Sequence, residues 1–173
     1  MLLRIENYSD LNERKLMDIY TESNLENTDF FFPDETNKET AVQKVEAAYL
    51  DFLKNEFFLQ NEAAYWILEK NGVWYSALRI CRVLNGPYYL EALETRPEFR
   101  GKGYASLLLS GVLDAFMNNG PFRICDCVSK KNTASLKVHA KCGFQIVSDN
   151  GYDYLQNEED NHDFGLEYRY PAE

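Results

Sequence analysis

The 173-residue sequence has little of what marks several large classes of protein. No stretch approaches the roughly 18 consecutive apolar residues of a membrane span. The first residues also lack the basic region and the apolar run of roughly 7–15 residues that form a secretory signal. We therefore expect a cytoplasmic protein that does not act at a membrane.

Cysteine and histidine are scarce, with four cysteines and two histidines. A zinc site needs about four ligands in recognisable pairs. Cys125 and Cys127 lie two residues apart in a strand-like run, but Cys81 and Cys142 do not form a second pair. The sequence therefore predicts reduced, buried thiols and no metal site.

Basic residues are fewer than acidic ones, 18 against 28, so the net charge is −10. Residues 96–141 nevertheless hold eight basic and three acidic residues, a local charge of +5 that leaves −15 for the remainder. Such a block indicates an anionic ligand, or else chance clustering on solvated faces. Nucleic acid would need a larger basic surface, so we expect no nucleic-acid partner.

The composition is that of a packed protein, with 45% hydrophobic and 14% aromatic residues. No repeat, low-complexity tract or Gly/Ser linker divides the chain, so we expect a single domain over residues 1–173. Within it, residues 1–60, 61–147 and 148–173 differ in pattern.

The pattern of residues 1–60 predicts a short strand over residues 2–6 and helices over residues 10–24 and 40–58. Asp10 is the expected N-cap of the first helix. Pro33 breaks the pattern between the helices, because it disfavours helix at the residue before it. Strand-like runs follow over 63–69, 73–83 and 88–95, and Asn71-Gly72 predicts a hairpin between the first two.

The second half alternates helices and strands: helix 103–118, strand 122–128, helix 132–142 and strands 144–147 and 164–170, with an acidic loop before the last strand. The fold class is thus α/β (α+β), with a mixed, mostly antiparallel central sheet of about 6–7 strands flanked by helices. A strand–helix–strand crossover over 88–128 should be right-handed and make its two strands parallel.

The most specific motif is Arg-Gly-Lys-Gly-Tyr-Ala at residues 100–105, between a strand and a long helix. Glycines at a helix N-terminus leave free N–H groups and allow close approach, which suits a pyrophosphate. Arg100 and Lys102 would add positive charge at the same place.

Two other phosphate-binding motifs and a simple turn are alternative interpretations of these glycines. A Walker P-loop is excluded, because no G-x-x-x-x-G-K-[ST] occurs. A dinucleotide fold stays open through Asp126, although a polar loop intervenes, the third glycine is missing and little chain follows. The glycines could also merely shape a turn.

Two blocks resemble the GNAT superfamily of N-acetyltransferases. Arg100, Gly103 and Ala105 match its R/Q-x-x-G-x-G/A signature for coenzyme A. Residues 132–144 resemble the family's N-x-x-[AS]-x-x-[LV]-[YH]-x-x-x-G-F element, and the likeness extends over residues 68–170. The resemblance implies acetyl-CoA as co-substrate and direct transfer to a primary amine in a ternary complex. The implied cofactor-binding residues are Leu93, Thr95, Arg100, Gly101, Lys102, Gly103, Tyr104, Ala105, Asn132 and Ser135.

The resemblance also implies catalytic roles. His139 stands where the family commonly has a tyrosine that protonates the departing thiolate, and an ordinary packing role is the alternative. Glu91 and Glu94 are the candidate bases, on opposite faces of a regular strand. A backbone N–H of Leu93 or Thr95 would stabilise the oxyanion.

By the family pattern, residues 1–60 and 148–173 bind the acceptor, and both parts are acidic. This favours a cationic small-molecule or peptide acceptor, such as a polyamine, an amino sugar or a basic peptide, although a solvated acidic loop would look the same. A non-catalytic acyl-CoA sensor and a nucleotide-dependent oxidoreductase are rival functions. Self-association into a homodimer stays open.

Overall fold

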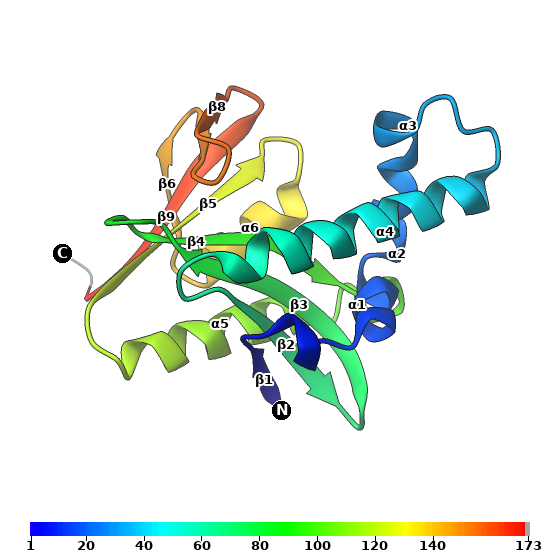
Figure 1. The fold of residues 1–173 in the computed structure, drawn as a ribbon. Helices are drawn as coiled ribbons and strands as arrows, with labels where there is room; N and C mark the ends of the chain where they lie inside the picture. The colour runs from blue at the N-terminus through cyan, green and yellow to red at the C-terminus, as the bar shows by residue number, and fades with distance from the viewer. Residues whose placement is uncertain (172–173) are drawn as a thin grey trace.

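The structure is a computed structural model that describes residues 1–171. Its main sheet has seven strands in the order β1-β2-β3-β4-β5-β9-β6, and a separate hairpin joins β7 to β8 (Figure 1). This confirms the mixed sheet flanked by helices that the sequence predicts. The strands are β1 (Leu2–Ile5), β2 (Ala64–Lys70), β3 (Val73–Arg82), β4 (Tyr88–Thr95), β5 (Phe122–Ser129), β6 (Gln145–Ser148), β7 (Gly151–Asp153), β8 (Glu158–Asp160) and β9 (Asp163–Tyr170).

Six α-helices cover the two faces of the sheet within the described chain. Helices α1 to α4 precede β2, and α4 crosses one face, whereas α5 and α6 lie on the other (Figure 1). Their bounds are α1 (Glu13–Ile19), α2 (Thr21–Glu26), α3 (Thr28–Phe31), α4 (Lys38–Asn55), α5 (Tyr104–Met117) and α6 (Thr133–Lys141).

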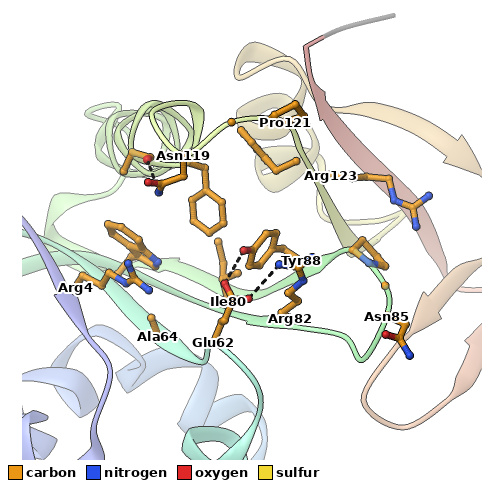
Figure 2. Close-up of a pocket in the computed structure, with 17 residues that line it drawn as sticks. Arg4, Glu62, Ala64, Ile80, Arg82, Asn85, Tyr88, Asn119, Pro121 and Arg123 are labelled. Carbon is orange, nitrogen blue, oxygen red and sulfur yellow. Dashed lines mark hydrogen bonds and ion pairs between the residues drawn. The ribbon is translucent and has the colours of Figure 1, made fainter.

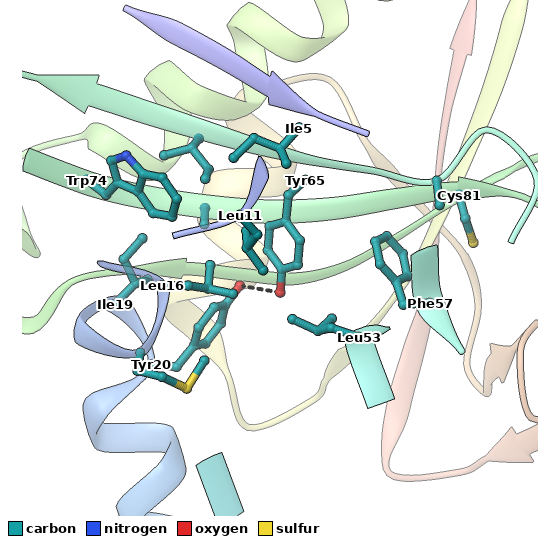
Figure 3. Close-up of a cluster of buried hydrophobic side chains, with 14 of the residues drawn as sticks. Ile5, Leu11, Leu16, Ile19, Tyr20, Leu53, Phe57, Tyr65, Trp74 and Cys81 are labelled. Atoms are coloured by element: carbon teal, nitrogen blue, oxygen red, sulfur yellow. Dashed lines mark hydrogen bonds between the residues drawn. The ribbon is translucent and has the colours of Figure 1, made fainter. Parts of the chain in front are cut away.

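The first core lies between α1, α4 and the sheet (Figure 3). Leu16, Leu53, Phe57 and Tyr65 are fully buried there. Because successive strand side chains alternate in direction, Trp66 belongs to the opposite core. Each buried aliphatic or aromatic side chain contributes about 1.5–3 kcal/mol, which holds the N-terminal helices against the sheet.

The second core lies under α5 and α6. Leu108 and Val112 of α5 pack against Leu78 and Leu90 of the sheet, and all four are fully buried. The apolar side chains of α5 therefore fix the direction in which its N-terminus points, toward the carboxyl end of β4.

The parallel pairing of β4 with β5 is confirmed, and it is short. Within residues 1–171 the two strands pair only at Tyr88↔Ile124 and Tyr89↔Cys125. Beyond Tyr89 they separate, so the edge of β4 that faces β5 has no partner strand.

A β-bulge in β4 lies where the two strands separate. Arg79 pairs with Glu91 and Ala77 pairs with Glu94, so β4 uses one residue more than β3 between the two pairs. Ala92 absorbs the extra residue with a φ of 54°. Because Ala77 and Arg79 point to one face, Glu91 and Glu94 do as well. The expectation that these glutamates lie on opposite faces is therefore wrong.

Three other details differ from the sequence-based expectations. The N-cap of α1 is Asn12, whose side chain accepts a hydrogen bond from Lys15 N, and Asp10 ends a preceding 3₁₀ turn. The expected helix over 10–24 is divided at Tyr20. The acidic loop before the last strand contains the β7–β8 hairpin, because its polar residues pair with one another.

Candidate active site

A cleft lies where β4 ends and α5 begins; we call it the glycine-loop cleft. Its volume is about 590 Å³, and α2 and the start of α6 complete its walls. It contains ten of the residues that the sequence singled out: Leu93, Glu94, Thr95, Arg100, Gly101, Gly103, Tyr104, Ala105, Asn132 and Ser135.

The glycines give this cleft an exposed backbone. Gly101 has a φ of 73° and Gly103, the N-cap of α5, has a φ of 82°. A Cβ atom at either position would meet no protein atom within 4 Å, so the space in front of them is open. The first N–H groups of α5 have no intrahelical acceptor and face that space, as a pyrophosphate requires.

The basic residues of the loop have other partners. Arg100 donates from Nε to the Thr95 carbonyl at 3.0 Å, and its guanidinium contacts the carboxylates of Glu94, at 2.8 Å, and Glu22. Lys102 donates to the Glu98 carbonyl at 3.0 Å. These contacts fix the loop against β4 and α2, so the anion site consists mainly of backbone N–H groups and the dipole of α5.

Helix α6 supplies the opposite wall of the cleft. The side chain of Asn132 caps it by accepting a hydrogen bond from Ser135 N at 3.0 Å. Ser135 and Val138 line the cleft, one turn along the helix. The N-cap is therefore a structural reason for an asparagine at this position.

His139 lies on the inner side of α6 and is completely buried. Its Nδ1 is 2.9 Å from the Ser135 carbonyl oxygen, and its Nε2 is 2.8 Å from Oδ2 of Asp126 on β5. Burial by itself lowers the pKa of His139, but the Asp126 carboxylate and the Ser135 carbonyl raise the pKa above its usual value.

A second cavity, of about 280 Å³, opens at the separation of β4 from β5; we call it the acidic cavity. Five carboxylates and one guanidinium line it, together with Ala92 and Cys127. The charged residues are Arg79, Glu91, Asp126, Asp153, Asp160 and Asp163. The sequence pointed to Glu91 and to the late acidic segment, but not to Asp126 as a residue of this cavity.

The two cavities adjoin across β4. Ala92 lines the acidic cavity, and Leu93 and Glu94, the next residues, line the glycine-loop cleft. The bulge at Ala92 is held by Tyr20, whose hydroxyl donates to the Ala92 carbonyl at 2.7 Å. Ligands in the two cavities would therefore meet at one short segment of backbone.

The two glutamates of β4 are both paired. Glu91 accepts from Arg79 through both oxygens, at 3.1 and 3.2 Å. Glu94 accepts from Ser23 and Arg100, each at 2.8 Å. Burial raises the pKa of Glu94, although its two partners oppose this. Glu91 lies in the acidic cavity and Glu94 in the glycine-loop cleft.

The aromatic and acidic residues near Pro33 lie elsewhere. Phe30 and Phe31 are exposed on α3, and Asp29 pairs with Lys38. Of the two regions expected to bind the acceptor, the late acidic segment is the one that lines the acidic cavity, through Asp153, Asp160 and Asp163.

A third cavity, of about 470 Å³, lies at the other end of α5 (Figure 2). Arg4, Arg82 and Arg123 line it. Each arginine is paired with a carboxylate, of Glu6, Glu62 and Glu167 respectively. Its positive charge is therefore largely balanced within the protein.

The described residues bear on two simpler questions. In residues 1–171, no three His, Cys, Asp or Glu side chains are grouped so that they could hold a metal ion. Over the same residues, no helix has the length and apolar character to cross a membrane.

Comparisons with solved structures agree with this geometry. The paia N-acetyltransferase of Thermoplasma acidophilum, solved with coenzyme A, is 15% identical with a TM-score of 0.66, over 98% of this chain and 99% of that one. The protein yncA of Salmonella typhimurium, solved with its cofactor acetyl-CoA, is 16% identical with a TM-score of 0.61, over 100% and 95%. The ribosomal-protein-S18-alanine N-acetyltransferase of Escherichia coli is 15% identical with a TM-score of 0.59, over 100% and 96%.

No curated protein matches the sequence closely enough to indicate its acceptor. The model of the Acetyltransferase (GNAT) family matches residues 16–144, which is well over half of the chain. That match includes the two sequence motifs at residues 100–105 and 132–144. It also includes the bulged strand β4 and the N-terminus of α5. The protein is therefore a member of the GNAT family of acyl-CoA-dependent acetyltransferases.

Proposed function

We propose that the protein transfers the acetyl group of acetyl-CoA to a cationic primary amine by direct attack in a ternary complex. One observation carries this proposal: an anion-binding cleft and an acidic cavity adjoin at Ala92 and Leu93 of β4. An anionic co-substrate and a cationic acceptor would approach each other at this segment of the strand.

Acetyl-CoA would occupy the glycine-loop cleft. Its pyrophosphate suits the N-terminus of α5, where Gly101 and Gly103 leave room for close contact. The arm that ends in the thioester would follow the unpartnered edge of β4. There the backbone N–H of Leu93 or Thr95 is the candidate donor to the oxyanion.

The acceptor would occupy the acidic cavity. Five carboxylates and one guanidinium give its walls a formal charge of −4 when all are ionised. Asp153, Asp160 and Asp163 come from the late segment, and no Lys or Arg side chain lines this cavity apart from Arg79 in residues 1–171. This arrangement favours an amine with more than one positive charge, because one ammonium can react while another remains near these aspartates.

Cys127 is the nucleophile that an acyl-enzyme mechanism would use, because it lines the acidic cavity. Burial, which is the largest influence, raises the pKa of Cys127 to about 11. The thiol is thus protonated at neutral pH, and the thiolate is the reactive form. Direct attack by the amine is therefore favoured over transfer through Cys127.

A thiol-release assay tests the proposal. Acetyl-CoA is offered with a panel of diamines, amino sugars, basic peptides, monoamines and neutral amine analogues, and the acetylated product is identified by mass spectrometry. We expect amine-dependent thiol release that is fastest for dicationic amines. Acetyl-CoA binding without thiol release for any amine would contradict catalysis and support the acyl-CoA sensor.

A further inference from the structure

Asp126 is a buried carboxylate between the acidic cavity and helix α6. It lies on β5, directly after the last residue paired with β4, and its exposed fraction is 6%. Asp126 is one of the residues that line the acidic cavity, and its Oδ2 is 2.8 Å from Nε2 of His139. Helix α6, which carries His139, also lines the glycine-loop cleft through Ser135 and Val138.

The two neighbours of the imidazole limit where its protons can lie. A carbonyl oxygen can only accept, so the Ser135 carbonyl at 2.9 Å requires a proton on Nδ1. A carboxylate opposite an unprotonated Nε2 would leave two acceptors facing each other without water. Nε2 is buried and has no well-aligned hydrogen bond in residues 1–171. The Asp126 carboxylate, at 2.8 Å, is the charged group beside it. Either an imidazolium beside an ionised Asp126, or a neutral ring that accepts a hydrogen bond from a protonated Asp126, resolves this conflict; we adopt the imidazolium, which ¹⁵N chemical shifts distinguish from the neutral ring.

The other candidate bases are paired with guanidinium groups, which stay charged at any physiological pH. Arg79 binds both oxygens of Glu91, and Arg100 binds Glu94. Asp126 instead has a partner whose charge depends on protonation. Burial raises the pKa of Asp126, and His139 only partly opposes this. A carboxylate with a raised pKa is a better proton acceptor than an ordinary one.

We propose that the Asp126 carboxylate takes the proton from the bound ammonium, and that His139 is the positioning residue that keeps this carboxylate ionised and in place. The inference rests on the proposed function. It gives His139 a different task from protonation of the thiolate, because both ring nitrogens face protein atoms in this structure.

An N–H bond of the ammonium breaks, and its proton moves to the Asp126 carboxylate. The freed lone pair forms the N–C bond with the acetyl carbon, and the C–S bond breaks with its electron pair on sulfur. A second proton leaves the nitrogen and reaches the sulfur through water. Amine and acetyl-CoA thus yield amide, thiol and one proton on Asp126, which returns to solvent.

The first test compares two acceptors of the same shape. One is a primary alkylamine that is protonated at pH 7, and the other carries fluorine beside the nitrogen and is unprotonated at pH 7. At saturating acceptor, Asp126→Asn should lower kcat for the first by about 10²- to 10⁴-fold, and for the second by less than about tenfold. Equal losses for both acceptors, or no loss, would overturn the assignment.

Asp163→Asn is the matched control, because Asp163 lines the same cavity but lies on β9. It should raise KM for the charged acceptor much more than it lowers kcat. If Asp163→Asn reproduces the kcat loss of Asp126→Asn, the effect belongs to the charge of the cavity and not to a specific proton acceptor.

His139→Gln tests the positioning role through the pH profile of kcat. Losing the imidazolium should raise the pKa of Asp126 further, so activity should begin to fall at a higher pH as the solution is acidified. A lower kcat with an unmoved profile would indicate only a packing role. The other titratable or charged groups around the carboxylate are Arg79, Tyr89, Glu91, Cys127, Asp153, Asp160 and Asp163.

A spectroscopic measurement on the unmodified protein does not depend on activity or on variants that fold. The ¹⁵N chemical shifts of His139 at pH 7 should show both ring nitrogens protonated. A neutral ring at pH 7 would overturn the proposed pair. If no amine supports thiol release by the wild type, the proposed function fails, whereas the NMR result still judges the pair.

Discussion

The glycine-loop cleft and the acidic cavity adjoin at β4, but they are built differently. The cleft uses the backbone of one short segment, residues 100–105, at the N-terminus of α5. The acidic cavity uses side chains from β3, β4, β5, β7, β8 and β9, which are far apart in the sequence. The proposed anion site is therefore local in the sequence, whereas the proposed cation site depends on the tertiary structure.

The largest expected effect on acetyl-CoA binding comes from a substitution in the glycine loop. Gly103→Val places a β-branched residue at a φ of 82° and fills the space before the helix N-terminus. At acetyl-CoA a hundredfold above its Kd, the wild type should gain about 2.7 kcal/mol, or roughly 5–10 °C in Tm. The variant should lose this gain in a thermal-shift assay.

Gly120→Ala is the control for backbone strain. Gly120 has a φ of 103° and follows the other end of α5. This variant should be less stable by about 1–3 kcal/mol, yet its Tm should still rise with acetyl-CoA. If the ligand also stabilises Gly103→Val by the wild-type amount, acetyl-CoA does not bind at this loop.

The largest expected effect on the stability of the unliganded protein comes from breaking the side-chain framework of the acidic cavity. The Arg79 and Glu91 side chains are 10% and 16% exposed, so Arg79→Met leaves a buried carboxylate without its partner. The free energy of unfolding should fall by about 3–5 kcal/mol, measured by chemical denaturation.

Arg82→Met is its control on the same strand. The Arg82 and Glu62 side chains are 46% and 42% exposed, and such a pair contributes only about 0–1 kcal/mol. Equal losses for the two variants would show that burial of the Arg79–Glu91 pair does not matter to stability.

The same difference explains how much could be predicted from the sequence. The sheet, the helix starting after Gly103 and the Asn71-Gly72 hairpin follow from local periodicity and from turn residues, and the structure has all three. The motif at residues 100–105 also predicted where most of the glycine-loop cleft lies, because a helix N-terminus acts through its own backbone.

The rest depends on tertiary contacts that local patterns do not contain. The bulge at Ala92 reverses the expected relation between Glu91 and Glu94, and nothing in the residues of β4 marks it. Likewise, Asp126 looks like an ordinary strand residue until α6 brings His139 within 2.8 Å of it. A polar residue in an apolar strand, followed by a histidine on the next helix, is the available signal.

A smaller effect should separate the aspartates of the acidic cavity from neighbouring exposed acids. With a dicationic acceptor, kcat/KM should fall as salt rises, since ions screen attraction beyond about 10 Å at 0.1 M. Asp160→Asn combined with Asp163→Asn should remove most of this dependence. Glu158→Gln with Glu159→Gln, on the exposed β8 hairpin, should remove little of it. The reverse pattern would assign acceptor attraction to the hairpin.

The smallest effect concerns stability and pH. The pKa values of Asp126 and His139 are both raised in the folded protein. Each group therefore binds its proton more tightly when folded, and its contribution is lost as pH rises through the folded pKa. The unfolding free energy of the wild type, relative to Asp126→Asn/His139→Gln, should decrease as pH rises above about 6.5. A difference that grows with pH would contradict the raised pKa values.

A crystal structure of the protein with coenzyme A and a dicationic amine tests the two-cavity arrangement most directly. We predict the pyrophosphate at the backbone of Gly101 and Gly103, and one ammonium in the acidic cavity within hydrogen-bond distance of Asp126. The two ligands should approach each other at Ala92 and Leu93. An amine bound in the glycine-loop cleft, or in the arginine-lined cavity at the far end of α5, would contradict the account.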